Sequence, residues 1–268
     1  MASMINDFSG PASISGLALR RQSVQTDDVA ANRILGGLSA TARDRLAPHV
    51  RVRAAREGAT LWETGTRSDR VHFPLTAMVS LVLRAGSGAD LEVGSVGLEG
   101  ACGFDTDLFP GAVRPVVRIG GLIASLPARE FDAAARDCPE LCRIAPACTA
   151  WLLAQAQQIA VCNATHTAEQ RFARWLARAA QATGRDTVAV TQETVAELLG
   201  LRRTTVTLIA QTLQTAGIIR YRRGIIAIID PAGLQAAACP CGETLGPAFQ
   251  PADLLAAASH PIGPEACA

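Results

Sequence analysis

Two pairs of adjacent arginines, Arg202 with Arg203 and Arg222 with Arg223, lie close together in the second half of the chain. A guanidinium group keeps its charge at physiological pH and offers a flat fork of donors, which suits phosphate oxygens and the O6 and N7 atoms of guanine. Residues 167–229 hold nine Arg and four acidic residues, although the net charge of the whole chain is only +1. Positive charge gathered in this way favours DNA, because phosphate counterions are released on binding. The arginines therefore predict a DNA interface in this region.

Two short helices are expected to carry the first arginine pair. Thr191 is suited to cap the start of one helix, and Gly200 can adopt the positive φ that ends it. A second helix begins after Leu201, with apolar residues recurring on one face that must pack inward. Its opposite face and its N-terminal tip are free to enter a major groove, which is wide enough for one helix. Arg203, at this tip, is the first choice for a base reader.

A basic hairpin is expected to carry the second arginine pair. Two isoleucine-rich runs, 218–219 and 225–229, flank the turn and are typical of short strands. A hairpin of this kind lays guanidinium groups along phosphates. The alternative is a helical pair whose arginines form a solvated face. The predicted DNA-binding residues are Thr191, Gln192, Arg202, Arg203, Thr204, Thr205, Thr207, Leu208, Arg222 and Arg223.

The remaining segments indicate an α+β protein. Short apolar runs separated by glycine-bearing turns predict an antiparallel barrel or jelly roll in the first half of the chain. A long helix follows, and then the winged helix-turn-helix described above. The predicted domains are a flexible arm (1–30), a sensor barrel (31–135), a dimerisation helix with a hinge (136–166), the winged helix-turn-helix (167–238) and a flexible tail (239–268).

The long helix is nearly uncharged and apolar on more than one side, so it needs burial on more than one side. A parallel helix from a second copy of the chain would supply that burial. The alternative is that the helix packs wholly against its own barrel. The residues predicted to line the dimer interface recur at three-four spacing: Ile144, Cys148, Trp151, Gln155, Ile159 and Cys162.

Cysteine usage and the absence of catalytic motifs restrict the function further. None of the eight cysteines has a His at zinc-finger spacing, so no metal site is predicted. Cys239 and Cys241, which flank one proline, are the pair that could bind a metal or respond to oxidants; the alternative is that they are plain tail residues. The sequence contains no metal triad, nucleophile elbow or phosphate-cradling loop, so no catalytic residue and no enzymatic activity are predicted. Without an apolar segment of membrane length or a signal-like N-terminus, the protein is expected to be cytoplasmic.

The order of barrel, long helix, hinge and winged helix resembles the Crp/Fnr family of bacterial transcription regulators. The motifs that carry the resemblance are TQETVAELLGLRRTTVTLIAQTLQTAGIIRYRRG, HTAEQRFARWL and VGLEGACGF, within a match over roughly residues 34–241. The resemblance implies a cyclic-nucleotide-binding-like barrel and a homodimer that binds a palindromic operator with half-sites about one helical turn apart. It also implies that Arg203, Thr204 and Leu208 read bases, with Arg202 and Thr205 nearer phosphates.

The sensor departs from the relatives that bind cyclic AMP. Those relatives place a Gly-Glu pair before an Arg-Ser pair, where this sequence has Gly103-Phe104 and Arg114-Pro115. Phe cannot accept a hydrogen bond from ribose, and Pro offers neither a hydroxyl nor an N–H to phosphate. Gly103, Phe104 and Arg114 therefore stay candidates for an unknown effector, and Arg114 is expected to pair with a carboxylate such as Glu99 or to hold another anion.

No cofactor is predicted for the chain. The oxygen-sensing branch of the resembled family carries an iron-sulfur cluster on N-terminal cysteines, and this cluster is not expected because no cysteine precedes Cys102. The expected partners are double-stranded DNA, a second copy of the chain, RNA polymerase and an unidentified small-molecule effector, with no membrane.

Overall fold

The first half of the chain forms short antiparallel strands, as its alternating apolar runs and glycine turns predicted. The computed structural model describes residues 29–86, 88–104, 111–244 and 250–257, so almost all of the predicted arm lies outside the described residues. Two three-stranded antiparallel sheets, β1-β6-β2 and β4-β3-β5, make up the sensor. The elements of this half are α2 (Arg33–Gly37), α3 (Ala40–Leu46), β1 (Arg51–Ala55), β2 (Arg70–Pro74), β3 (Met78–Arg84), β4 (Asp90–Val96), β5 (Arg114–Ile119) and β6 (Gly121–Pro127).

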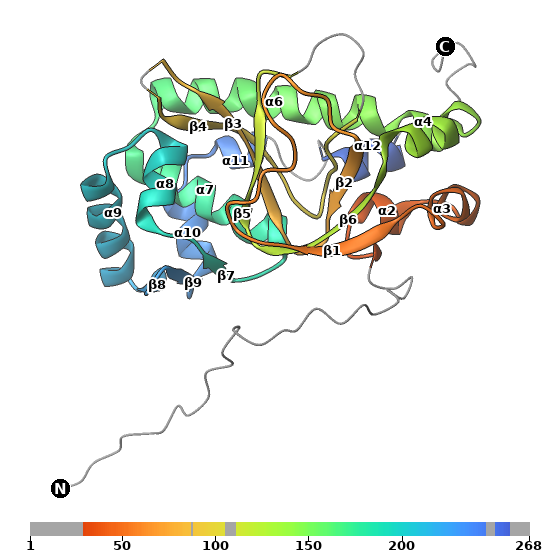
Figure 1. Cartoon of the computed structure of the whole chain (residues 1–268). Coiled ribbons are helices and arrows are strands. Elements are labelled where there is room, and N and C mark those ends of the chain that lie inside the picture. The colour runs from red at the N-terminus through yellow and green to blue at the C-terminus, as the bar shows by residue number, and fades with distance from the viewer. Residues whose placement is uncertain (1–28, 87, 105–110, 245–249, 258–268) are drawn as a thin grey trace, which may run out of the picture.

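Three helices connect the sensor to the second half of the chain: α4 (Ala128–Arg136), α5 (Pro139–Cys142) and α6 (Ile144–Thr165). Pro146 lies in the first turn of α6, where a missing N–H breaks no helical hydrogen bond, so it marks the helix start and causes no kink. Figure 1 shows α6 running along one side of the molecule beside β3 and β4.

The burial of α6 corrects the predicted dimer interface. Ile144, Cys148, Trp151, Gln155 and Cys162 are buried within the protomer, and Ile159 is half-buried, so this stripe is not available to a partner. The reason is that the helix is apolar on more than one side: the sensor covers Ile144, Cys148 and Gln155, and the segment after α10 covers Cys162. The side-chain amide of Gln155 accepts a hydrogen bond from the Ser95 N–H at 3.1 Å and donates one to the Ser95 carbonyl at 3.0 Å.

The second half of the chain is a winged helix-turn-helix. Its elements are α7 (Ala168–Thr183), β7 (Thr187–Ala189), α8 (Gln192–Leu199), α9 (Arg203–Thr215), β8 (Ile219–Arg222) and β9 (Ile225–Ile228), with sheet order β7-β9-β8. Thr167 and Gln170 form a capping box at the start of α7, which satisfies two of the free donors there. Gly184 and Gly200 end α7 and α8 in the left-handed conformation that favours glycine.

Three further helices follow the wing: α10 (Pro231–Ala237), α11 (Cys241–Thr244) and α12 (Pro251–Ala257). The segment predicted as a flexible tail is therefore partly folded. Helix α12 contacts α2 and α6, and an ion pair joins Arg33 to Asp253 at 2.8 Å. The sequence of this segment is poor in periodic apolar residues, and contacts with distant helices hold its ordered part.

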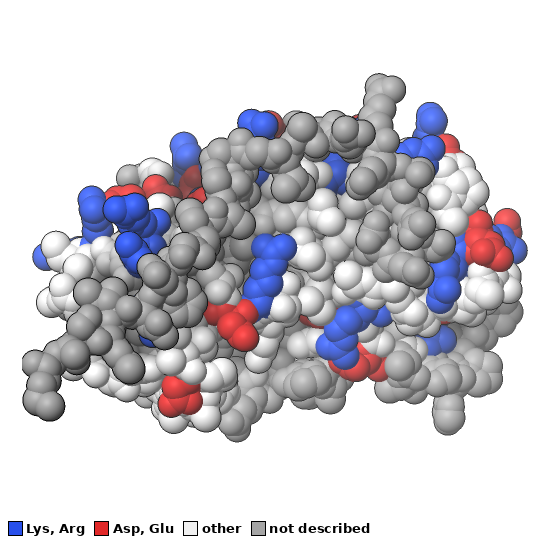
Figure 2. Space-filling view, turned by 90° about the horizontal axis from the view of Figure 1, so that it is seen from below, with Lys and Arg blue, Asp and Glu red and all other residues white. Residues whose placement is uncertain are grey.

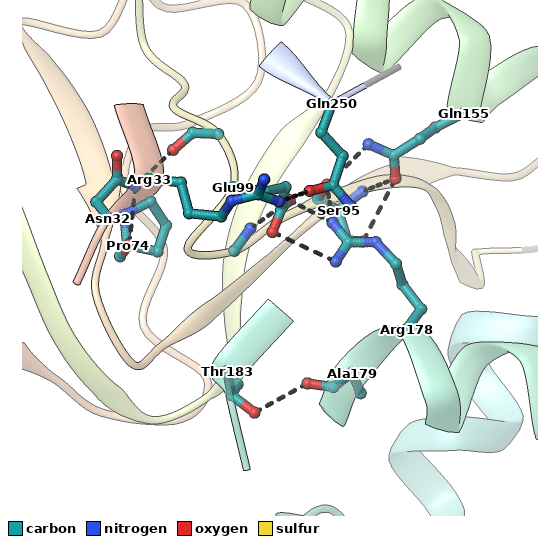
Figure 3. Close-up of polar contacts among 12 residues, drawn as sticks. Asn32, Arg33, Pro74, Ser95, Glu99, Gln155, Arg178, Ala179, Thr183 and Gln250 are labelled. Carbon is teal, nitrogen blue, oxygen red and sulfur yellow. Dashed lines mark hydrogen bonds and ion pairs between the residues drawn. The ribbon is translucent and has the colours of Figure 1, made fainter. Parts of the chain in front are cut away.

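The sensor and the winged helix share one core, which the sequence did not predict. Met78, Val82 and Val116 of the sensor strands are buried in the same cluster as Trp175 and Leu176 of α7. Their junction also carries polar contacts that Figure 3 shows converging between β4, α6 and α7. The guanidinium of Arg178 donates to the carboxylate of Glu99 at 2.5 Å and to the Ser95 carbonyl at 3.2 Å.

Candidate nucleic-acid interface

Helix α9 presents a buried face and an exposed face, as the sequence predicted. Val206, Ile209, Ala210 and Leu213 are buried against the rest of the domain. Leu208 is 64% exposed on the other face. Arg202 is the N-cap residue and Arg203 the first helical residue, and both are exposed at the tip. Helix α9 therefore has the shape of a recognition helix, with an outer face and a basic tip free to meet base edges.

The predicted DNA-binding residues differ in exposure. Exposed are Thr191, Arg202, Arg203, Thr204, Leu208, Arg222 and Arg223; half-buried are Gln192, Thr205 and Thr207. Thr191 caps α8, since its hydroxyl accepts from the Thr194 N–H at 3.1 Å. Gln192 accepts a hydrogen bond from the Thr207 hydroxyl at 2.7 Å. The bonded side chains of Gln192 and Thr207 therefore brace α8 against α9 and fix the angle between these helices.

An acidic residue beside the tip was missed by the sequence analysis. The Glu193 carboxylate lies 3.6 Å from the Arg203 guanidinium, and the two side chains are 65% and 69% exposed. An ion pair this exposed contributes about 0–1 kcal/mol, so it orients Arg203 without holding it back from a phosphate or a base. An acidic residue such as Glu193 in the first turn of α8 is an ordinary helix signal, and nothing in the sequence places it against Arg203.

The wing turns through two residues with positive φ, Arg223 at 49° and Gly224 at 78°, as in the type I′ turn that suits two-residue hairpins. Arg222 pairs with Ile225 across this turn. The Tyr221 N–H donates to the side chain of Gln214 at 2.8 Å, which ties the wing to the end of α9. The wing arginines are held at a fixed place relative to the recognition helix.

Basic side chains gather at the end of the molecule where α8, α9, β8 and β9 lie. Figure 2 shows blue side chains grouped there, with fewer and more scattered charges over the middle of the same face. Arg202, Arg203, Arg220, Arg222 and Arg223 of this end are all exposed. We call this surface, formed by these five arginines, the basic end.

The candidate effector residues of the sensor are already engaged within the chain. Gly103 has a φ of 90°, and a Cβ there would lie 2.3 Å from the Arg70 carbonyl, so only glycine fits. The ring of Phe104 packs edge-on against Phe131 with centroids 5.2 Å apart. Arg114 forms an ion pair with Asp90, whereas Glu99, the partner named from the sequence, pairs with Arg178.

Asp90 binds two guanidinium groups. The hydrogen bond from Arg84 and the charge of Arg114 hold the pKa of the Asp90 carboxyl below its usual range. The ionised carboxylate in turn neutralises Arg114, at the position where the cyclic-AMP-binding relatives place the arginine that holds phosphate. Glu99 could not be excluded from the sequence, because the strand register that places Asp90 beside Arg114 is not visible there.

The cysteine pair after α10 is not part of a solvated tail. Cys239 is fully buried and Cys241 half-buried, beside the C-terminal end of α6. Burial, followed by the neighbouring Cys162 thiol, raises the pKa of Cys239 to about 11. Cys239 is therefore a protonated thiol at neutral pH and a weak nucleophile when no cation is bound.

A comparison with known proteins identifies the winged helix-turn-helix as a known type of domain. Residues 170–237 match the family model of the Crp-like helix-turn-helix domain. No curated protein matches the chain in sequence. Within the described ranges of the chain, no helix has both the length and the apolarity to cross a membrane.

Solved structures of Crp/Fnr regulators share the fold over most of their length. FixK2 from Bradyrhizobium japonicum is 17% identical with a TM-score of 0.60, and the match covers 71% of this chain and 98% of FixK2. A CRP-family regulator from Thermus thermophilus is 19% identical with a TM-score of 0.57, covering 69% of this chain and 96% of that one. The c-di-GMP-responsive global regulator CLP from Xanthomonas campestris is 15% identical with a TM-score of 0.56, and the match covers 71% of this chain and 99% of CLP.

The fold, the recognition helix with its wing and the match to the domain model agree with one another. The chain therefore carries a Crp-like helix-turn-helix domain over residues 170–237 and shares the fold of Crp/Fnr regulators.

Proposed function

We propose that the chain binds a palindromic DNA operator as a homodimer, with one α9 helix of each copy in the major groove. The observation that carries this proposal is the basic end, where the exposed tip Arg202–Arg203 and the wing Arg222–Arg223 flank one helix. Two copies related by a two-fold axis would present two such helices to half-sites about one helical turn apart, roughly 34 Å. Arg203 and Thr204 read bases in this arrangement, and the wing arginines bind phosphates.

The face of α6 that the sensor leaves uncovered is the proposed dimer surface. Leu153 is 58% exposed and Val161 is 52% exposed, in a helix whose other face is buried. Ala150, Ala160 and Ala164 are exposed on the same helix. Small and aliphatic side chains let two parallel helices approach closely, and burying them removes apolar surface from water.

The proposed regulator is not controlled by cyclic AMP. Phe104 packs against Phe131, and Arg114 is neutralised by Asp90. Pro115 is buried in β5 opposite Leu81. Phe104 and Pro115 lack the polar group that ribose or phosphate would need, and the guanidinium of Arg114 is already paired. CLP is described as responsive to c-di-GMP, so its fold serves an effector other than cyclic AMP. The proposal also includes RNA polymerase as a partner, a small-molecule effector of unknown chemistry, and a location in the cytoplasm.

Selection of DNA by the purified protein from a random library, with and without added cyclic AMP, tests this function. A two-fold symmetric site recovered equally in both conditions is the expected result. A site recovered only with cyclic AMP would overturn the interpretation of Phe104 and Pro115. A site without symmetry would contradict the dimer, and no enriched site under any salt condition would contradict specific binding itself.

A second candidate function is a response to thiol chemistry or to a metal through Cys239 and Cys241. The burial of Cys239 beside the end of α6 favours this candidate over plain tail residues. Burial raises the pKa of Cys239 to about 11, and because oxidation and metal binding both use the thiolate, the pKa does not choose between them. Replacing both cysteines with Ser should abolish any metal dependence of operator binding.

A further inference from the structure

Four side chains that can bind a metal meet where the long helix ends. Cys162 lies in the last turn of α6, and His166 is its C-cap, so their spacing of four residues places both on one face. Cys239 and Cys241 come from the segment after α10, on the far side of the winged helix in sequence. The Cys162 and Cys239 sulfurs are 3.8 Å apart, and His166 Nε2 is 3.1 Å from the Cys241 sulfur.

The four donor atoms have the spacing of a tetrahedral site. All of them lie within 4.8 Å of one another. With Zn–S bonds of about 2.3 Å, the edge between two sulfurs of a regular tetrahedron is about 3.8 Å, and the edge between a sulfur and a nitrogen is about 3.5 Å. The Cys162–Cys239 separation equals the expected edge, and the other separations lie within about 1 Å of theirs, which small rotations of the cysteine side chains would correct.

The chemistry of the set selects the metal. Three sulfurs and one imidazole are soft, tetrahedral donors, typical of zinc. All four positions are filled by protein, as in structural zinc sites, with no open position for water. Three thiolates and one Zn²⁺ leave one negative charge, and Arg174 carries the opposite charge beside Cys239 and Cys241. The Nε atom of Arg174 is buried and finds no hydrogen-bond partner within the described part of the chain.

We propose that Cys162, His166, Cys239 and Cys241 form a structural zinc site that fastens the end of α6 to the winged helix-turn-helix. Binding releases the three thiol protons to solvent, and no electron is transferred. Residues 162–167 connect the proposed dimerisation helix to the domain that holds the recognition helix. A metal at this joint would fix the direction in which α9 is presented to DNA. This role rests on the proposed function, whereas the site itself does not.

The first measurement is the metal content of the full-length protein, purified under reducing conditions and without added metal. About one zinc ion per chain is expected in the wild type, and none in C239S/C241S. Loading the metal-free wild type with Co²⁺ should give the strong visible bands of a tetrahedral thiolate site, and Zn²⁺ should bleach them. Cys148→Ala, which changes a buried cysteine near the other end of α6, is the matched control and should keep its zinc.

A second readout keeps the test decisive if the double variant does not fold. Alkylation of the native wild type, followed by peptide mapping, should show Cys241, the half-buried thiol of the set, protected by zinc and reactive after a chelator is added. His166→Gln should shift the cobalt bands, since it removes the single nitrogen ligand. A disulfide between Cys162 and Cys239 that persists through purification under reducing conditions, or zinc retained by C239S/C241S, would overturn the site. Because none of these readouts involves DNA, failure of the site and failure of operator binding are separate results.

Discussion

Arg203 is the side chain that we propose reads a base. It begins α9, is 69% exposed and is held only by a weak pair with Glu193. Replacing it with Ala should remove about 1–3 kcal/mol of discrimination at one base pair of each half-site, because a bidentate contact to guanine is lost. Competition binding against operators changed at single positions measures this loss.

Two matched variants separate base reading from charge. Arg222→Ala should weaken binding to every sequence alike and should lower the slope of log affinity against log salt by about 1, as expected for a phosphate contact. Arg129→Ala removes an exposed arginine of the sensor and should change neither quantity. If Arg203→Ala behaves like Arg222→Ala, with uniform loss across operator variants, Arg203 is a phosphate contact and another residue reads the base.

The residues that could be predicted from the sequence depend on near neighbours. Thr167, Thr191 and Gly200 act on backbone groups a few residues away, so composition and spacing are sufficient to find them. Cys162 and His166 were assigned to a dimer stripe and a hinge, and nothing local connects them to Cys239 and Cys241. Only the packing of α10 on α7 brings these distant parts of the chain together.

For helix α6, too, only the local properties could be predicted from the sequence. Its length, its start near Pro146 and its apolar character could be predicted, because they are local properties. Which face meets the sensor could not, since the helix is apolar all round and offers no amphipathic signal. The hydrogen bonds between Gln155 and Ser95 fix the rotation of the helix about its axis and so determine which face meets the sensor.

The exposed face of α6 gives a prediction about assembly. The substitutions Leu153→Glu and Val161→Glu together should convert a dimer into a monomer, because carboxylates would face each other across the two-fold axis. Like charges in this position cost on the order of 3 kcal/mol, or about a hundredfold in the dimer dissociation constant. Light scattering after size-exclusion chromatography reports the mass.

The control for this variant is Leu122→Glu, which changes a side chain of β6 that is 39% exposed. It adds the same kind of charge on a partly exposed apolar side chain and should leave the dimer intact. A Leu153→Glu/Val161→Glu protein that remains dimeric, with unchanged unfolding temperature, would place the interface elsewhere on the molecule.

At the scale of the whole molecule, the sensor and the winged helix form one packed body in this conformation. A Cβ on Gly97 would lie 2.4 Å from the Cβ of Ala182 in α7, so the two parts touch through backbone. The Leu98 N–H donates to the Ala182 carbonyl at 2.9 Å. Any signal that reorients α9 relative to the sensor must therefore separate α7 from β4, or must move α6 and the winged helix together.

Glu92 makes this junction sensitive to pH. Its carboxyl is buried between β4 and α7, and burial raises its pKa above the usual range despite hydrogen bonds from Ser80 and Trp175 and the nearby charges of Arg178 and Arg174. The folded protein therefore holds this proton more tightly than the unfolded chain does. The resulting stabilisation is complete below the pKa of an ordinary glutamate and is lost as pH rises through the higher pKa of the folded state.

Glu92→Gln should remove this pH dependence, because an amide does not titrate. The amide oxygen can still accept the hydrogen bond from Trp175, so the packing of the junction is kept. Relative to the wild type, the free energy of unfolding of the variant should increase as pH rises from acidic to neutral, and thermal or urea unfolding across that range measures it. Trp175→Phe keeps a buried ring but removes the donor, so it should cost about 1–3 kcal/mol and leave the wild-type direction of the pH dependence. Parallel pH profiles for the wild type and Glu92→Gln would mean that Glu92 binds its proton equally in the folded and unfolded chains, and the junction would then be insensitive to pH.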